Sequence, residues 1–351
     1  MKRVNWVPIT FLLLSLLGLY YSDMSPTFVT NEVITRFIRD GIMILALILP
    51  ITAGMGINFA VTVGAMSAQI GLLTVIILQI KGFPGLALAL LVGVLLSIIL
   101  GYIIGVGLNR VKGREMIATI IIGFLANGIY QLIFLAGYGT WIKPLNQEII
   151  LSRGVGVRNM VDLVSYRHIM DQLWTIEVGK IELPIFMILV VILACLTVAY
   201  LMNTRFGQRI KAVGLESSKA SLLGIDVNRA RIQAIIASMV IACIGQLIFL
   251  QNIGMLNVYT AHLNTDVFSA AALLAGGATI KEARVRNMVF GVFLFHALFI
   301  VSPQAGQNLF GNAALGEYFR SFVAYGTIAL ALVLNVQRQN VARQKNRQTG
   351  F

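Results

Sequence analysis

Long apolar segments recur through this sequence and constrain its fold more than any motif does. Hydrophobic residues make up 58% of the 351 residues and charged residues 12%, whereas a soluble domain is about 45–50% apolar and about 25% charged. Many of the apolar runs reach the roughly 20 residues that a helix needs to cross a bilayer. The runs are continuous rather than alternating, which favours helices over barrel strands. The sequence therefore predicts an all-α, polytopic membrane helical bundle.

We predict ten transmembrane helices in one domain that covers residues 1–351. The predicted spans are residues 6–22, 38–54, 58–79, 85–108, 116–137, 184–203, 232–253, 265–280, 288–302 and 321–337. The first run follows Lys2 and Arg3 but is not followed by a small-residue cleavage site, so we interpret it as a retained span rather than a signal peptide.

The distribution of positive charge predicts the orientation. With both termini in the cytoplasm, cytoplasmic segments contain 18 of the 27 Lys and Arg residues, as the positive-inside rule requires. The net charge of +13 then reflects topology rather than nucleic-acid binding. Residues 138–183 become a long extracytoplasmic loop, in which we expect one or two short helices. Residues 204–231 become a cytoplasmic loop, and residues 338–351 a basic, disordered tail.

A polar insert, "RFGQRIKAVGLESSKASLLGID" at residues 205–226, interrupts the apolar pattern. Its second half predicts a short amphipathic helix that starts near Glu216, which suits the positive end of the helix dipole. Ala220 and Leu223 are expected to share a face, and Gly224 to end the helix. The insert is either a rigid projection that docks on a partner or an ordinary solvated loop.

The sequence lacks the motifs of an enzyme that hydrolyses ATP or peptides. Gly179-Lys180 is not preceded by the glycine that a phosphate-binding loop requires. Cys195 and Cys243 lie in apolar runs and are expected to be buried rather than paired or metal-bound. We therefore expect no cofactor, no metal and no catalytic residue in this chain.

Polar side chains inside the spans are candidates for a solute pathway, because such residues are costly in a membrane and usually face the bundle interior. The candidates are Asn58, Gln69, Asn127, Gln131, Gln246 and His296, with Phe59 beside the first of them. Asn127 and Gln131 are four residues apart and share a helix face. The alternative is hydrogen bonding between helices. No span is expected to bury an Asp or Glu, which favours a neutral solute and disfavours a proton-coupled carrier.

The polar insert resembles the cytoplasmic coupling loop of ABC importer permeases, in the branch that carries ribose, other monosaccharides and branched-chain amino acids. The positions that match that loop in register are Gly207, Ala212, Gly214, Ala220, Gly224 and Ile225. Three other stretches are similar to the family: "MGINFAVTVGAMSAQIG" at 55–71, "KGREMIATIIIGFLANGIYQLIF" at 112–134 and "AALLAGGATI" at 271–280. Asn58, Phe59 and "EARVR" at 282–286 depart from it, which suggests a divergent subgroup.

The resemblance implies a permease subunit in a bacterial plasma (inner) membrane. Its implied partners are ABC ATPase subunits that bind ATP, an extracytoplasmic solute-binding protein and a second permease subunit, identical or related. The matching loop positions, together with Glu216, would couple to the ATPase. The expected solute is a monosaccharide, with a nucleoside or a branched-chain amino acid as alternatives. A stand-alone secondary carrier is the competing class.

Overall fold

The computed structural model describes residues 6–143, 145–152, 154–322, 325–326, 328–329 and 333. The tenth predicted span, 321–337, falls largely outside these residues, and so do Lys2, Arg3 and the basic tail 338–351. The chain is mainly helical and divides into two compact units, Ile38–Asp266 and Met1–Phe37 with Val267–Phe351. The predicted class of helical membrane protein is confirmed.

Five helices in the described part of the chain are long and apolar enough to cross a membrane. They are α5 (Gly82–Arg110), α6 (Glu115–Leu132) continued by the π-helix η1 (Ile133–Gly137), α7 (Ile185–Asn203), α10 (Val227–Ile253) and α12 (Val285–Phe310). The shorter apolar helices are α1 (Trp6–Ser22), α4 (Val61–Ile77) and α11 (Thr265–Ala275). All eight overlap spans predicted from the sequence, and the full number of ten stays a prediction.

The second predicted span, 38–54, is wrong in its bounds. Helix α2 (Pro26–Leu45) begins twelve residues earlier and is followed by the short α3 (Ile48–Thr52). Proline suits the first position of a helix because its fixed φ is already helical and it has no N–H to satisfy. The polar first half of α2 resembles a loop in the sequence, but Arg36 lies 3.9 Å from Glu32, four residues earlier, as helical spacing allows.

In the unit that contains the N-terminal helix, α1 packs against α12. The Ser15 hydroxyl donates to the Leu294 carbonyl across this contact, at 3.2 Å. Val29 and Val33 of α2 are buried with Ile300 and Val301 of α12. Aliphatic packing of this kind stabilises the unit without committing many polar groups.

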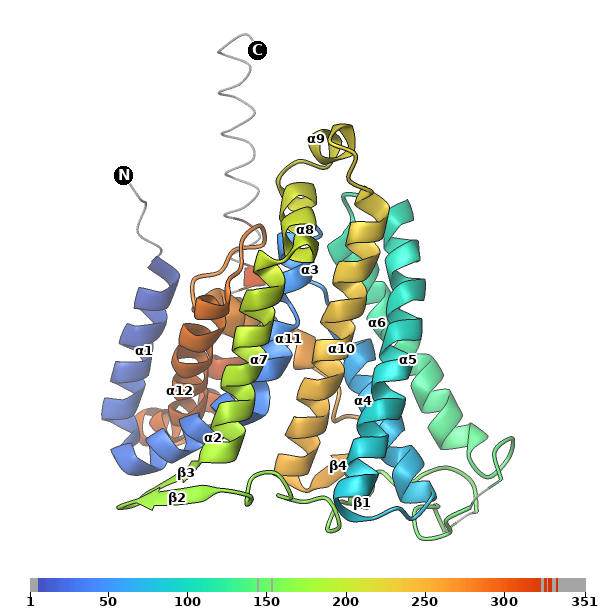
Figure 1. Cartoon of the computed structure of the whole chain (residues 1–351). Helices are drawn as coiled ribbons and strands as arrows, with labels where there is room; N and C mark the ends of the chain where they lie inside the picture. Colours follow the sequence, from blue (N-terminus) through green and yellow to red (C-terminus); the bar gives the residue numbers. More distant parts are fainter. Residues whose placement is uncertain are drawn as a thin grey trace. The chain divides into compact units, whose positions relative to one another are not determined.

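In the unit Ile38–Asp266, helices α4, α5 and α10 pack against one another. Two short helices, α8 (Arg205–Leu215) and α9 (Ser217–Leu222), lie at one end of this unit, while β1 (Met160–Asp162) and β4 (Met255–Asn257) lie at the other (Figure 1). Helix α10 runs between the two ends. A buried ion pair between Glu115 and Arg231 joins the beginnings of α6 and α10.

The long loop 138–183 contains strands where short helices were predicted, and this prediction is wrong. Strand β1 pairs antiparallel with β4, and β2 (Thr175–Val178) forms a hairpin with β3 (Ile181–Pro184). No α-helix occurs among the described residues of this loop. Several of its glycines adopt positive φ, which favours turns, and its β-branched residues favour strands.

Asp171 fastens this loop to the end of α10. Its Oδ1 accepts a hydrogen bond from Gln251 at 2.8 Å, and its Oδ2 accepts one from Asn252 at 2.8 Å. The Nδ1 of His168 lies 2.9 Å from the same Oδ2. Gln251 and Asn252 of α10 thus attach the loop to this end of the unit through Asp171.

Candidate functional site: a helical knob and a buried polar cluster

The polar insert, called the knob below (residues 205–226), folds into α8 and α9. The helix predicted for its second half is confirmed as α9 (Ser217–Leu222), and Gly224, two residues after its end, adopts the left-handed conformation with φ of +78°. The Ile225 N–H closes the end on the Ala220 carbonyl at 3.0 Å, a common way to satisfy the last carbonyls of a helix. Asp226 then caps α10, because its Oδ1 accepts from the Arg229 N–H at 2.9 Å.

A small apolar core joins the two helices of the knob to the beginning of α10. Val213 of α8, Ala220 of α9 and Ala230 of α10 are buried together, and Ala212, Ile225 and Val227 pack around them. The three helices are therefore held by apolar contacts as well as by the chain that connects them. Such a support fixes the orientation of whatever the knob exposes.

Gly214 brings α8 into backbone contact with the turn that follows α3. A Cβ at this position would lie 1.9 Å from the Thr52 carbonyl oxygen, far inside van der Waals contact. Gly54, on the other side of this contact, has φ of +78°, a conformation that glycine adopts without steric cost. The knob is thus seated on the residues between α3 and α4.

The surface of the knob carries three leucines. Leu215 is 89% exposed, Leu222 87% and Leu223 79%. Beside them, the Lys219 ammonium lies 2.8 Å from the Glu216 carboxylate; the hydrogen bond from Lys219 lowers the pKa of Glu216, and the same bond raises the pKa of Lys219. Exposed apolar side chains flanked by charged groups are typical of an interaction surface.

The predicted coupling residues lie mostly inside the knob rather than on its surface. Gly207 and Ala220 are buried, Ala212, Gly214 and Ile225 are half-buried, and Glu216 and Gly224 are exposed. The shared face predicted for Ala220 and Leu223 is not confirmed, because Ala220 is buried in the core while Leu223 is 79% exposed. The three exposed leucines were not predicted, although apolar residues in a polar insert were a visible signal.

A buried polar cluster forms around His262, in the segment between α10 and α11. Its Nδ1 lies 3.1 Å from Gln69 Oε1 of α4, and its Nε2 lies 2.8 Å from Asn127 Oδ1 of α6. Gln131 Nε2 donates to the same Asn127 oxygen at 3.2 Å. Gln246 of α10 donates to the carbonyl of Ala261 at 3.0 Å. The structure thus brings together four predicted pathway residues, Gln69, Asn127, Gln131 and Gln246.

Sequence reasoning missed the residue at the centre of this cluster. His262 is 1% exposed, and burial lowers its pKa to about 4, so the ring is neutral near pH 7. It lies outside every predicted span, which is why the sequence did not single it out. The Tyr130 ring meets it edge-on, with 5.1 Å between centroids.

Three polar atoms around His262 have no hydrogen-bond partner among the described residues. They are Gln69 Nε2, Tyr130 OH and Gln246 Oε1, on side chains that are at most 3% exposed. A buried polar group left unpaired costs about 1–3 kcal/mol, and native proteins contain few of them. The cluster therefore has unused hydrogen-bonding capacity inside an otherwise apolar unit.

Asn58 and Phe59 lie elsewhere, in the irregular segment before α4. Asn58 is 2% exposed; its Oδ1 accepts from the Ala60 N–H at 3.1 Å, and its Nδ2 donates to Ser238 at 3.4 Å. Phe59 is also buried, and Thr119 Oγ1 accepts from its N–H at 3.2 Å. Both ends of the Asn58 amide therefore serve the backbone turn and α10. A role in the solute pathway stays a prediction for these two residues.

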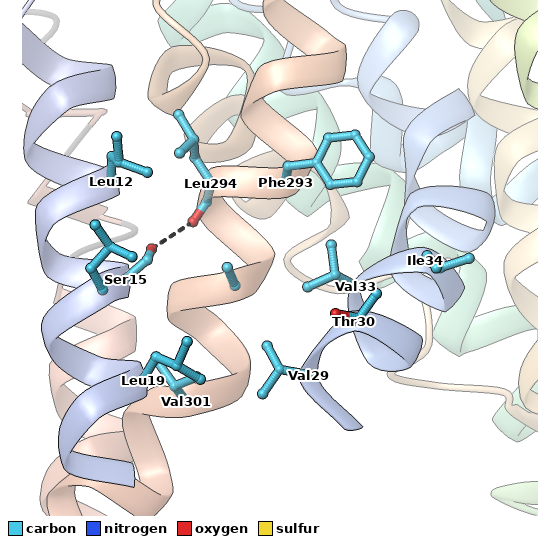
Figure 2. Close-up of a pocket in the computed structure, with 12 residues that line it drawn as sticks. Leu12, Ser15, Leu19, Val29, Thr30, Val33, Ile34, Phe293, Leu294 and Val301 are labelled. Carbon is cyan, nitrogen blue, oxygen red and sulfur yellow. Dashed lines mark hydrogen bonds between the residues drawn. The ribbon is translucent and has the colours of Figure 1, made fainter. Parts of the chain in front are cut away.

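An apolar cavity of about 340 Å³ lies in the other unit, among α1, α2 and α12 (Figure 2). Its only polar side chains are Ser15 and Thr30. Ser15 donates to Leu294 and Thr30 to Pro26 at 2.8 Å, so neither hydroxyl has a proton left to donate. The cavity suits an apolar group and offers little to a polar solute.

The long apolar helices, the helical knob at one end of the unit Ile38–Asp266 and the buried polar cluster inside that unit are features of a polytopic membrane protein. The chain belongs to the family described as the permease component of branched-chain amino acid transport systems, whose model matches residues 29–333. This confirms the family expected from the knob and the three similar stretches, together with the location in the bacterial inner membrane.

The curated relatives are transport permeases. The chain is 24% identical to the fructose import permease protein FruG of Bifidobacterium longum over 240 residues, 68% of this chain and 64% of the relative. It is 26% identical to the probable ABC transporter permease protein YphD of Escherichia coli over 60% of each chain. It is 23% identical to the fructose import permease protein FrcC of Rhizobium meliloti over 82% of this chain and 75% of the relative.

The chain thus covers somewhat less than two thirds of the first two relatives it matches. No solved structure matches it significantly.

Proposed function

We propose that this chain is the membrane-spanning subunit of an ABC importer that carries a monosaccharide inward by alternating access. The observation that carries the proposal is the knob, a prefolded surface of three exposed leucines on a rigid support. Such a surface can transmit the motion of a partner, because its own core moves as one body. The chain's place in the permease family and the names of its fructose-importing relatives agree with this function.

In this proposal the chain has ten membrane spans, and both termini face the cytoplasm. The knob then projects into the cytoplasm, where two ATPase subunits bind and hydrolyse ATP. The loop 138–183 faces outward and receives the solute-binding protein, while a second permease subunit completes the pathway. Closure of the ATPases would move the knob, and Gly214 would pass that movement to the segment between α3 and α4. The solute would move as the assembly shifts between two conformations.

The proposal is tested by ATP-dependent uptake of radiolabelled sugars into proteoliposomes that contain the full importer. Neutral sugars, nucleosides and branched-chain amino acids are offered separately. We expect uptake of a sugar that needs ATP, the ATPase and the binding protein. Uptake by this chain alone, without ATP, would show a secondary carrier; ATP-driven uptake of a nucleoside or an amino acid only would replace the sugar by that solute.

The knob is tested by Leu222→Asp and Leu223→Asp. A carboxylate in a desolvated apolar contact is costly, so we expect the ATPase to be lost from the purified complex and uptake to fall at least tenfold. Leu145→Asp is the matched control for ATPase binding, because Leu145 is also exposed, at 72%, but lies in the loop at the opposite end; this variant should keep the ATPase bound. If the leucine variants keep the ATPase bound and uptake intact, the knob is not the docking surface.

A further inference from the structure

The polar cluster around His262 has the composition of a site for a neutral, hydroxylated solute. Its side chains come from α4, α6, α10 and the segment before α11, so four parts of one unit converge on it. All are uncharged: Gln69, Asn127, Tyr130, Gln131 and Gln246, with a neutral His262 at the centre. Amide, hydroxyl and imidazole groups both donate and accept, as sugar hydroxyls do.

The unpaired atoms persist whichever way the amides are turned. If Gln69 is rotated so that its Nε2 donates to His262, its Oε1 becomes the atom without a partner. Gln246 cannot be turned, because the Ala261 carbonyl it faces only accepts. Tyr130 is buried, and its hydroxyl lacks a partner among the described residues. The cluster therefore keeps at least one donor and one acceptor that the protein does not use.

The aromatic rings beside these atoms suit the other face of a sugar. Tyr130 lies 4.8 Å from Phe134 and 5.1 Å from His262, measured between ring centroids. The C–H groups of a pyranose or furanose ring can pack on such rings while its hydroxyls reach the amides. The apolar cavity of the other unit offers no comparable combination.

We propose that the His262 cluster is where the translocated sugar is held as it crosses the membrane, with Tyr130, Gln69 and Gln246 as the residues that bond its hydroxyls. This assignment rests on the importer function proposed above. It adds two residues to the predicted pathway, His262 and Tyr130, and gives them a shared task with Gln69. The two half-buried residues, Asn127 and Gln131, lie where the cluster reaches towards the surface of the unit.

Tyr130→Phe tests the site because it removes only the hydroxyl. If that hydroxyl had no solute to bond, its removal would leave uptake unchanged, since no group among the described residues bonds to it. We expect the uptake efficiency of the assembled importer to fall about fivefold to tenfold, the loss of one hydrogen bond to the solute, at unchanged thermal stability. Tyr138→Phe is the matched control: Tyr138 is 1% exposed, and its hydroxyl donates to the Asn146 carbonyl at 3.4 Å. It should keep wild-type uptake.

A series of deoxy sugars gives a readout that altered packing would not change. For each analogue, the ratio of uptake efficiency, parent over deoxy, is compared between wild type and Tyr130→Phe with the same binding protein. We expect the ratio to approach one in the variant for a particular hydroxyl. Gln69→Met should do the same for another hydroxyl, which provides a second test.

The outcomes separate this site from the importer function. Wild-type uptake of a sugar with both variants unchanged, or with every ratio unchanged, would overturn the site and leave the importer proposal standing. A wild-type assembly that imports no sugar would overturn the importer proposal and the sugar assignment together. If the two variants reduce the uptake of a nucleoside or of the amino acid leucine but not that of a sugar, the choice of a sugar is overturned.

Discussion

The knob and the His262 cluster belong to the same unit but are built in opposite ways. The knob buries alanine and valine and exposes leucine at 79–89%, so its unsatisfied groups are apolar and face outward. The cluster buries amides and a hydroxyl, so its unsatisfied groups are polar and face inward. The exposed leucines of the knob suit a protein partner. The unpaired amides and hydroxyl of the cluster suit a hydroxylated solute.

This difference shows that the groups left without a partner indicate function better than the residue type does. Alanine and glycine at the matching family positions turn out to support the knob, and the leucines that no motif marks form its surface. In the interior, Asn58 is 2% exposed, but its amide oxygen and nitrogen each have a hydrogen-bond partner. The two regions should therefore respond differently to substitution, with large stability effects in the interior and small ones on the knob surface.

The largest stability effect is expected where the interior holds a charge. Arg231→Met removes the partner of the buried Glu115, and an uncompensated buried charge costs about 3–5 kcal/mol. The measurement is the thermal unfolding of the purified protein in detergent. Arg229→Met is the matched control, because Arg229 is exposed on the same helix, and it should leave the transition in place. An equal shift in both variants would contradict a special role for the pair.

The second-largest loss of stability is expected at low pH, through His262 of the polar cluster. The pKa of His262 is lowered from 6.5 to about 4 by burial, so between these values the unfolded chain binds a proton that the folded chain does not. The contribution is therefore fully present above pH 6.5 and is lost as the pH falls towards 4, by about 3 kcal/mol in total. His262→Gln should flatten the pH dependence of thermal stability in that window. An unchanged profile would show that His262 is not buried as a neutral ring.

An intermediate loss of stability is expected at the contact between Gly214 of the knob and the Thr52 carbonyl. In Gly214→Ala the new methyl group would lie 1.9 Å from the Thr52 oxygen, and such overpacking costs about 1–3 kcal/mol. Gly107→Ala is the control, because a Cβ on this glycine of α5 meets no atom within 4 Å. Unfolding temperatures of the two variants decide: a stable Gly214→Ala protein would mean that α8 moves away from the turn at little cost.

The smallest stability effect is expected on the knob surface. Leu222→Ser replaces a side chain that is 87% exposed, and such surface changes usually stay within about 0.5 kcal/mol. Thermal unfolding of the isolated chain should be unchanged, while affinity for the ATPase falls. A clear loss of stability in Leu222→Ser would show that Leu222 packs within the chain. The knob surface would then not differ from the interior in its response to substitution.

The sequence by itself determined the class of the protein and its family. Apolar runs of membrane-spanning length depend only on local composition, and the spacing of glycine and alanine from Gly207 to Gly224 is a linear pattern, so both are visible without coordinates. Helix α9, in the second half of the knob, was predictable for the same reason. Asn127 and Gln131 could be assigned to one face because they are a single turn apart.

Only the tertiary structure decided which side chains are left without partners. His262, Gln69 and Gln246 are separated by up to 193 positions, and nothing local indicates that they meet. The strands of the loop 138–183 depend in part on β4, almost a hundred residues away, and therefore could not be predicted from the loop alone. Burial and hydrogen-bond satisfaction are properties of the packed chain, which is why the candidate solute site appeared only once α4, α6 and α10 were placed together.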